Sequence, residues 1–255
     1  MKHVKNVTAA TLAAATMLSA VGCNSQSSDV PKIEPEKNAD GNYNILFIST
    51  DQERYFSTFP EGTDYKARQL LAELGTTFEK HYVCANVSTS SRSVIYTGTH
   101  ITDTAMLDNI DFDWQAPLDE SLVTVGDRMR EAGYYTAYKG KWHMGDSSIL
   151  EGVKPQITDL EGYGFADWGG VDRIGKVWEG FEADPEITSE AVLWLDGKGK
   201  QLNAEGKSFF LAVNFVNPHD IMNYDNTGFK SNYLKLGGKP ESEVYDKTYA
   251  DPVPA

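Results

Sequence analysis

The chain has 255 residues and a formal net charge of -14, because 23 lysine and arginine residues stand against 37 aspartate and glutamate residues. So acidic a protein repels phosphate backbones and anionic lipid headgroups, which argues against a nucleic-acid-binding function. A hydrophobic content of 40% suffices for a sizeable core, and two cysteines are too few for a disulfide framework.

The first residues are typical of a bacterial export signal. Two lysines precede an uncharged apolar run, Val7–Gly22, which is short for a membrane span. Small residues before Cys23 resemble a lipobox, in which the cysteine becomes lipidated, although ordinary signal-peptidase cleavage also suits the run. We expect residues 1–23 to be a lipoprotein signal peptide and residues 24–43 a flexible tether, on an exported protein that is periplasmic or anchored to the outer membrane.

After the tether, predicted strands alternate with predicted helices. Apolar runs rich in β-branched and aromatic residues predict strands over residues 44–50, 77–83, 134–138 and 208–216. Apolar positions at helical spacing predict helices over residues 64–74, 125–132 and about 187–202. The first strand is apolar throughout, which predicts burial on both faces. This alternation favours an α/β fold, with a mostly parallel central sheet and helices on both faces.

Polar residues follow three of the predicted strands. They are Asp51 and Gln52, Lys141 and His143, and His219. Since ligands of parallel sheets bind beyond the carboxyl ends of the strands, these residues are predicted to share one site. Asp51 and Gln52 offer oxygen ligands to a divalent cation, although an aspartate at a strand end also caps turns.

The segment Ser88–Gly98 predicts a helix that begins with serines and Arg92. Its first amides and the guanidinium would form a positive nest for a tetrahedral anion, which the side chain of Ser88 could attack. A helix start rich in serine and threonine that serves only as an N-cap gives the same pattern, so this segment alone leaves both interpretations open.

Four motifs together resemble, in order and context, the type I sulfatases of the alkaline-phosphatase superfamily. They are N-x-L-x-x-S-T-D-Q, S-T-S-S-R-S-V-I-Y-T-G, G-K-W-H-M-G and N-P-H. The resemblance runs from about Asn44 to about His219. It implies an alkaline-phosphatase-like fold and the hydrolysis of sulfate esters of sugars or other organic molecules.

The resemblance also implies roles for the site residues. Ser88 takes the position of the nucleophile, which an external maturase oxidises to formylglycine, and Arg92 is the arginine of the same signature. Asp51, Gln52 and the residue at position 88 would ligate Ca²⁺ or another divalent cation. The remaining catalytic residues implied by the resemblance are Lys141 and His143 of the G-K-W-H motif and His219, which would hold the sulfate or protonate the leaving oxygen.

Several features depart from the family pattern. Ser88 stands where cysteine predominates, which restricts maturation to an oxygen-independent route unless a Cys-to-Ser change has disarmed the protein. Ser90 replaces the usual proline or alanine, and Gln52 replaces a second aspartate, so the metal site loses one negative charge. Family members continue further and carry more metal ligands there. We therefore expect residues 44–255 to be the N-terminal part of a catalytic domain.

Two other functions remain open. An unmodified Ser88 could attack phosphorus directly, which would make the chain a phosphoesterase or phosphonate monoester hydrolase. The chain could also be an inactive truncated relative that only binds anions. Cys84 is predicted to be a buried strand residue and not the nucleophile. His81, His100, Trp142 and Trp168 are predicted to be structural.

Overall fold

The structure is a computed structural model, and it describes residues 34–56, 58, 62–63, 65–145, 160–175 and 178–223. The predicted signal peptide with Cys23, the start of the tether and the chain after residue 223 lie outside the described residues. The chain divides into two compact units, Met1–Ile33 with Tyr65–Thr77, and Glu34–Asp64 with Phe78–Ala255. In the first unit the structure describes helix α1 (Lys66–Leu74), which matches the helix predicted over residues 64–74.

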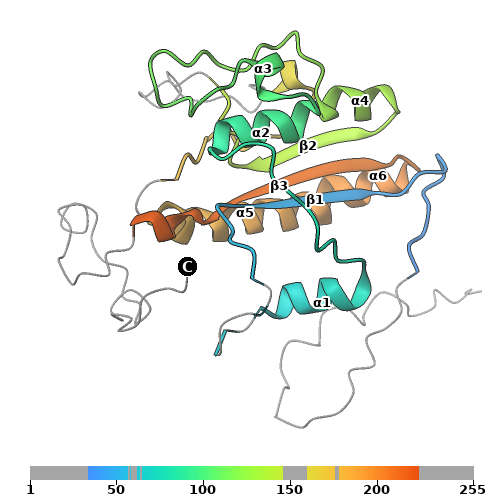
Figure 1. The fold of residues 1–255 in the computed structure, drawn as a ribbon. Coiled ribbons are helices and arrows are strands. Elements are labelled where there is room, and N and C mark those ends of the chain that lie inside the picture. Colours follow the sequence, from blue (N-terminus) through green and yellow to red (C-terminus); the bar gives the residue numbers. More distant parts are fainter. Residues whose placement is uncertain are drawn as a thin grey trace, which may run out of the picture. The chain divides into compact units, whose positions relative to one another are not determined.

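The second unit is built on a three-stranded parallel sheet with the strand order β1-β3-β2 (Figure 1). The strands are β1 (Ile45–Asp51), β2 (Tyr135–Gly140) and β3 (Phe209–Pro218). Asn214 of the central strand is in register with Ser49 on one side and with Gly140 on the other. The carboxyl ends of all three strands therefore meet at one edge, as the predicted parallel sheet requires.

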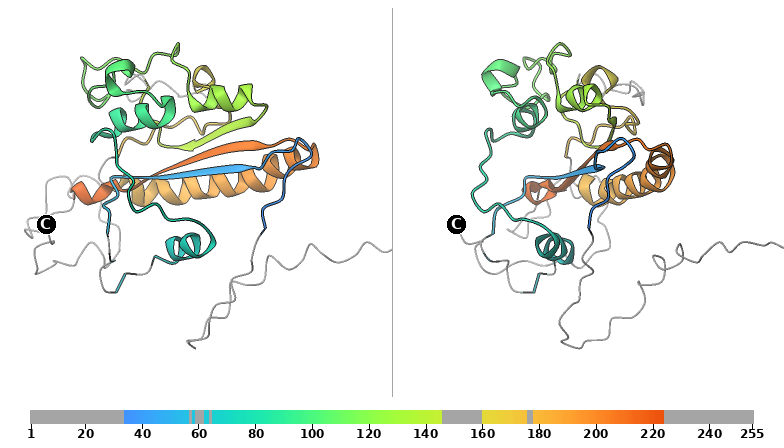
Figure 2. Two further views of the ribbon diagram at one scale, coloured as in Figure 1. Left: turned by 45° about the vertical axis from the view of Figure 1, so that its right-hand side comes forward. Right: turned by 90° about the vertical axis from the view of Figure 1, so that its right-hand side faces the viewer.

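Helices cover both faces of this sheet. Figure 2 shows α5 along one face, while α2 and α4 lie on the other. The helices of this unit are α2 (Ser88–Thr97), α3 (Ile101–Thr104), α4 (Val125–Glu131), α5 (Glu179–Trp194) and α6 (Lys200–Ala204). A π-helical segment, Leu195–Gly199, joins α5 to α6, and short 3-10 turns span Glu161–Tyr163 and His219–Asn223.

Side-chain alternation along β3 divides the core into two clusters. Phe209, Leu211 and Val213 pack with the apolar residues of α5. Phe210 and Ala212 point to the opposite face, into an aromatic cluster with residues of α2 and β2. The aromatic cluster also contains the buried Trp142 and Trp168, which confirms their predicted packing role.

Several predicted elements differ from the structure. The first strand is not buried on both faces, since Leu46 is 47% and Ile48 51% exposed. Both lie on the α5 side of the sheet, where α5 packs against β3 and β2 and leaves β1 less covered. Residues 77–83 form no strand, and Cys84, predicted to be buried, is exposed. Helix α5 begins at Glu179 rather than near residue 187, with acidic residues in its first turn that favour a helix start there.

The other predicted elements are close to their observed positions. The strands predicted over 134–138 and 208–216 each extend two residues further at their carboxyl ends. His100 has a structural role, since its Nδ1 accepts a hydrogen bond from the backbone amide of Thr102 at the start of α3. None of the helices in the described part of the chain is long and apolar enough to cross a membrane.

Candidate active site

Asp51 lies at the centre of the candidate site. It ends β1, is 8% exposed, and its Oδ2 atom is 3.0 Å from Arg92 Nη2 and 2.6 Å from Lys141 Nζ. Burial opposes ionisation of the carboxyl group, but the charges of Arg92 and Lys141 outweigh burial and hold its pKa well below the usual range. One carboxylate thus faces two cations, and the surplus positive charge favours an anionic ligand.

Ser88 is the first residue of α2 and faces the same carboxylate. Its hydroxyl donates a hydrogen bond to Asp51, with Oγ 2.8 Å from Oδ1 and 3.0 Å from Oδ2. The N-cap residue is Val87, so Ser88 does not act as the helix cap. The next amide, that of Thr89, donates to Asn109 Oδ1 at 3.2 Å, so part of the predicted amide nest already has an acceptor.

Arg92 joins the carboxyl ends of all three strands. Besides Asp51 at the end of β1, its guanidinium donates through Nη1 to the carbonyl of Lys141 at 2.8 Å and to Asn214 Oδ1 at 3.4 Å. Two buried tyrosines support the same acceptors: Tyr138 donates to the Lys141 carbonyl at 2.7 Å, and Tyr96 donates to Asn214 Oδ1 at 2.9 Å. The arginine is therefore fixed by a polar network under the site.

Lys141 directly follows β2 and is fully buried. Its ammonium group contacts Asp51 and donates to the carbonyl of Ile174 at 2.8 Å. Burial and the nearby charge of Arg92 lower the pKa of Lys141, while Asp51 opposes this shift. The ammonium group, which carries three N–H donors, thus has two protein acceptors.

His143 lies two residues further and is 2% exposed. Its backbone adopts a left-handed conformation with φ 56°, and its Nε2 lies 3.4 Å from Asp111 Oδ2. Hydrogen bonding to His143 lowers the pKa of Asp111. Among the described residues, the buried Nδ1 of His143 has no hydrogen-bond partner.

His219 follows β3 and is partly buried. Burial lowers its pKa, the positive charge of Lys141 lowers it further, and Asp51 opposes the shift. The carbonyl of Ile174 accepts from Lys141, and the next residue, Gly175, contacts His219, so one loop segment connects the ends of β2 and β3. Gly175 lies against the ring of His219, where a Cβ atom would come within 2.4 Å of Cε1 and Nδ1.

The predicted metal ligands are only partly brought together. Asp51 and Ser88 are in contact, but the side chain of Gln52 is exposed. No group of three or more His, Cys, Asp or Glu side chains within the described residues is arranged to hold a metal ion. Ca²⁺ takes six to eight oxygen ligands, and Asp51, the one carboxylate among the three predicted ligands, already pairs with two cations, so these three residues do not by themselves fit a calcium site.

The comparison with known families settles what kind of protein this is. The sequence profile of the family named Sulfatase matches residues 43–235. The chain belongs to the sulfatase family. It is 27% identical over 205 residues to a choline-sulfatase of Rhizobium meliloti, covering 71% of this chain and 39% of that relative. It is also 32% identical over 106 residues to arylsulfatase J of Mus musculus, covering 40% of this chain and 17% of that relative.

A solved structure gives the same fold. The crystal structure of a candidate sulfatase from Bacteroides thetaiotaomicron is similar with a TM-score of 0.50 and 22% sequence identity, covering 74% of this chain and 37% of that chain. The alkaline-phosphatase/sulfatase-like α/β fold is thereby confirmed. The matched part of this chain spans about two-fifths of the length of the choline-sulfatase.

Sequence reasoning missed three residues that shape the site. Asn214 could have been noticed as a polar residue within an otherwise apolar strand, at a position that shares a face with Phe210 and Ala212. Asp111 and Asp172 lie in loops outside every motif. Asp172 contacts the G-K-W-H segment from about thirty positions further along the chain, and no local sequence pattern predicts this contact.

Proposed function

We propose that this sulfatase-family chain cleaves sulfate esters, from a small molecule or a glycan, at the carboxyl ends of β1, β2 and β3. The observation that carries the proposal is the position of Ser88, whose Oγ lies 2.8 Å from an aspartate that also pairs with two buried cations. A nucleophile at position 88 would meet a sulfate group whose oxygens face positive charge.

The cations would act on charge that develops on the sulfate oxygens. Lys141 is held by protein acceptors on both sides, and Arg92 is fixed by the network beneath it, so neither needs to reorganise during the reaction. His219 follows β3, beside the loop segment that contacts Lys141, and would protonate the leaving oxygen. His143 lies beside Asp111 and would bind the sulfate from the β2 side.

We further propose that a maturase oxidises Ser88 to formylglycine, whose hydrate would supply the attacking oxygen. The family resemblance also implies a divalent cation such as Ca²⁺, ligated by Asp51, Gln52 and the residue at position 88. Because the described donors do not fit this cation by themselves, the roles given above to Arg92, Lys141 and His219 are independent of it.

Mass spectrometry of the peptide that contains Ser88 tests the proposed modification. A loss of two hydrogens at that residue, together with hydrolysis of an aryl sulfate, is the expected result. An unaltered mass together with phosphatase activity would instead support direct attack by serine. The hydrogen bond from Ser88 to Asp51 favours this second candidate, because it orients an unmodified hydroxyl at the site. An unaltered mass without either activity would leave a protein that only binds anions.

The proposed location is outside the cytoplasm, on a lipoprotein anchored through Cys23. The charge pattern and the lipobox-like sequence of the first 23 residues support it. Labelling with a radioactive fatty acid tests the anchor: the wild-type chain should take up label, and the Cys23→Ala variant should not. Equal labelling of both chains would contradict it.

A further inference from the structure

One loop touches all three basic residues at the strand ends. We call residues Trp168–Gly175 the strap. Asp172 contacts the backbone of the G-K-W-H segment, Ile174 contacts Lys141, and Gly175 packs against His219. These three contacts fall within four consecutive residues of one loop.

Asp172 makes the most extensive of these contacts. Its carboxylate accepts the backbone amide of Trp142 at 2.9 Å and that of His143 at 2.8 Å, with a second contact to His143 at 3.1 Å. Hydrogen bonds to an ionised carboxylate are stronger than those to a neutral group. His143 needs such support, because a residue with a Cβ atom adopts a φ of 56° only where its surroundings enforce it.

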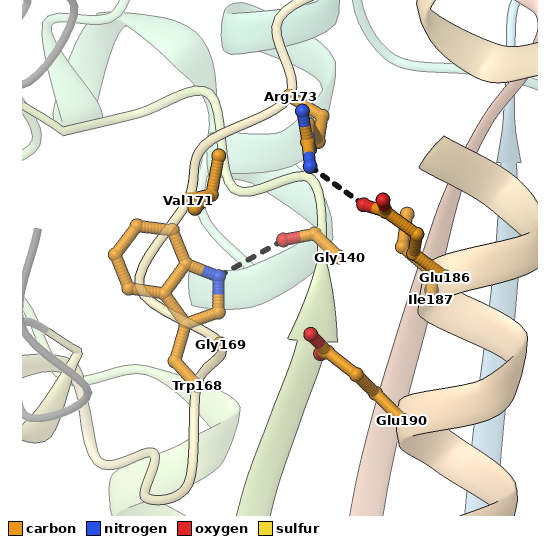
Figure 3. A pocket seen from close by; sticks show the side chains of 8 residues that line it. All are labelled: Gly140, Trp168, Gly169, Val171, Arg173, Glu186, Ile187 and Glu190. Carbon is orange, nitrogen blue, oxygen red and sulfur yellow. Dashed lines mark hydrogen bonds and ion pairs between the residues drawn. The ribbon is translucent and has the colours of Figure 1, made fainter. Parts of the chain in front are cut away.

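The strap is anchored at both ends by contacts away from the site. Figure 3 shows Trp168 donating through its indole N–H to the carbonyl of Gly140, and Arg173 pairing with Glu186 of α5. These two bonds are 3.0 Å and 2.8 Å long, and a pocket lined by strap and α5 residues lies between them. Asp172 can therefore hold the G-K-W-H segment from a loop that is itself fixed to β2 and α5.

Gly175 completes the arrangement on the β3 side. It has a φ of 97°, which side-chain-bearing residues rarely adopt, and any Cβ atom would collide with the ring of His219. Its amide donates to the carboxylate of Glu179 in α5, which fixes the backbone of Gly175 next to the His219 ring. The imidazole ring of His219 therefore occupies the space that a side chain at position 175 would need.

We propose that the strap is a positioning element, in which Asp172 sets the placement of His143 and Gly175 sets that of His219. The inference deepens the proposed function, since both histidines belong to the proposed sulfate site. Neither Asp172 nor Gly175 touches the reacting atoms, so both are positioning residues and not catalytic ones.

The test compares Asp172→Ala, Gly175→Ala and the control Lys200→Ala by NMR of the histidine rings and by binding of inorganic sulfate. Asp172→Ala should shift the ring signals of His143 and leave those of His219 in place, whereas Gly175→Ala should do the reverse. Both should weaken sulfate binding at least tenfold. Lys200→Ala removes only an exposed pair with Asp196, outside the strap, and should change sulfate affinity by less than twofold.

Asp172→Asn keeps the volume of the side chain and one acceptor oxygen, so it covers the case in which Asp172→Ala fails to fold. It should give an intermediate shift of the His143 signals. Ring signals that stay unchanged in folded Asp172→Ala or Asp172→Asn would overturn the inference. If the wild-type chain neither binds sulfate nor cleaves sulfate esters, the proposed function fails, while the ring signals of the unliganded chain still decide the role of the strap.

Discussion

The two faces of the sheet are built from alternate residues of the same strand, yet they differ in kind. On the α5 face, Leu211 and Val213 lie in an apolar cluster. On the α2 face, Phe210 and Ala212 of β3 lie in the aromatic cluster. The next residue of β3 on this face, Asn214, accepts a buried hydrogen bond from Tyr96. One strand can therefore build an ordinary core on one side and support the chemistry of the site on the other.

The aromatic face combines packing with positioning. The rings of Tyr96 and Tyr138 lie 5.7 Å apart within the core, while their hydroxyls hold Asn214 and the carbonyl of Lys141. Both groups also accept from Arg92. Loss of the hydroxyl of Tyr96 or Tyr138 should therefore change the site as well as stability, whereas substitutions on the α5 face should change stability alone.

The largest effect is expected from Asp51→Asn. Arg92 and Lys141 would lose their shared counter-charge while remaining buried, which should destabilise the fold by about 3–5 kcal/mol. Urea unfolding gives the free energy. The matched control is Asp196→Asn, which removes a carboxylate from an exposed pair with Lys200 and should cost less than about 0.5 kcal/mol. An equal loss of unfolding free energy in Asp51→Asn and Asp196→Asn would contradict the stabilising role of the buried Asp51 ion pairs.

Leu211→Ala tests the α5 face. Leu211 is fully buried in the apolar cluster, so its truncation should destabilise the fold by about 2–5 kcal/mol. The folded variant should bind inorganic sulfate as tightly as the wild type, as measured by isothermal titration calorimetry. A folded Leu211→Ala variant that no longer binds sulfate would show that the two faces are not separable.

The stability contributed by Asp51 should depend on pH. Its pKa is lowered in the folded state, so the unfolded chain takes up the proton first as the pH falls. The contribution is complete above about pH 4, the ordinary range of aspartate, and declines by up to about 1.4 kcal/mol per pH unit below it. The difference in unfolding free energy between wild type and Asp51→Asn should therefore narrow from pH 4 downward, and a constant difference would argue against the ion pairs.

Among the substitutions at the site, Tyr138→Phe is expected to change stability least. Losing the hydroxyl that donates to the Lys141 carbonyl should cost about 1 kcal/mol of stability, and a less constrained lysine should lower kcat/KM about tenfold. Tyr163→Phe is the control, because Tyr163 lies in the same aromatic cluster but donates to Leu118 at 2.8 Å. Tyr163→Phe should lose a similar amount of stability and keep its activity. If both variants lost activity equally, the hydroxyl of Tyr138 would have no positioning role beyond packing.

The sequence predicts the parts of the fold that depend on short segments. Strand ends carrying Asp51, Lys141 and His219 are visible as polar residues after apolar runs, and a parallel sheet brings them to one edge. The exposure of β1 was not predictable, because it depends on which strands α5 covers. Asp172 was not predictable either, because its contact with His143 is made by tertiary structure and leaves no local pattern.

A crystal structure of the chain soaked with vanadate, which mimics the five-coordinate sulfur of the transition state, would test the location of the reaction most directly. We expect vanadate oxygens within about 3 Å of the side chain at position 88 and of Lys141 Nζ, with Arg92 still paired to Asp51. Vanadate bound away from the carboxyl ends of the strands, with residue 88 turned from Asp51, would contradict it.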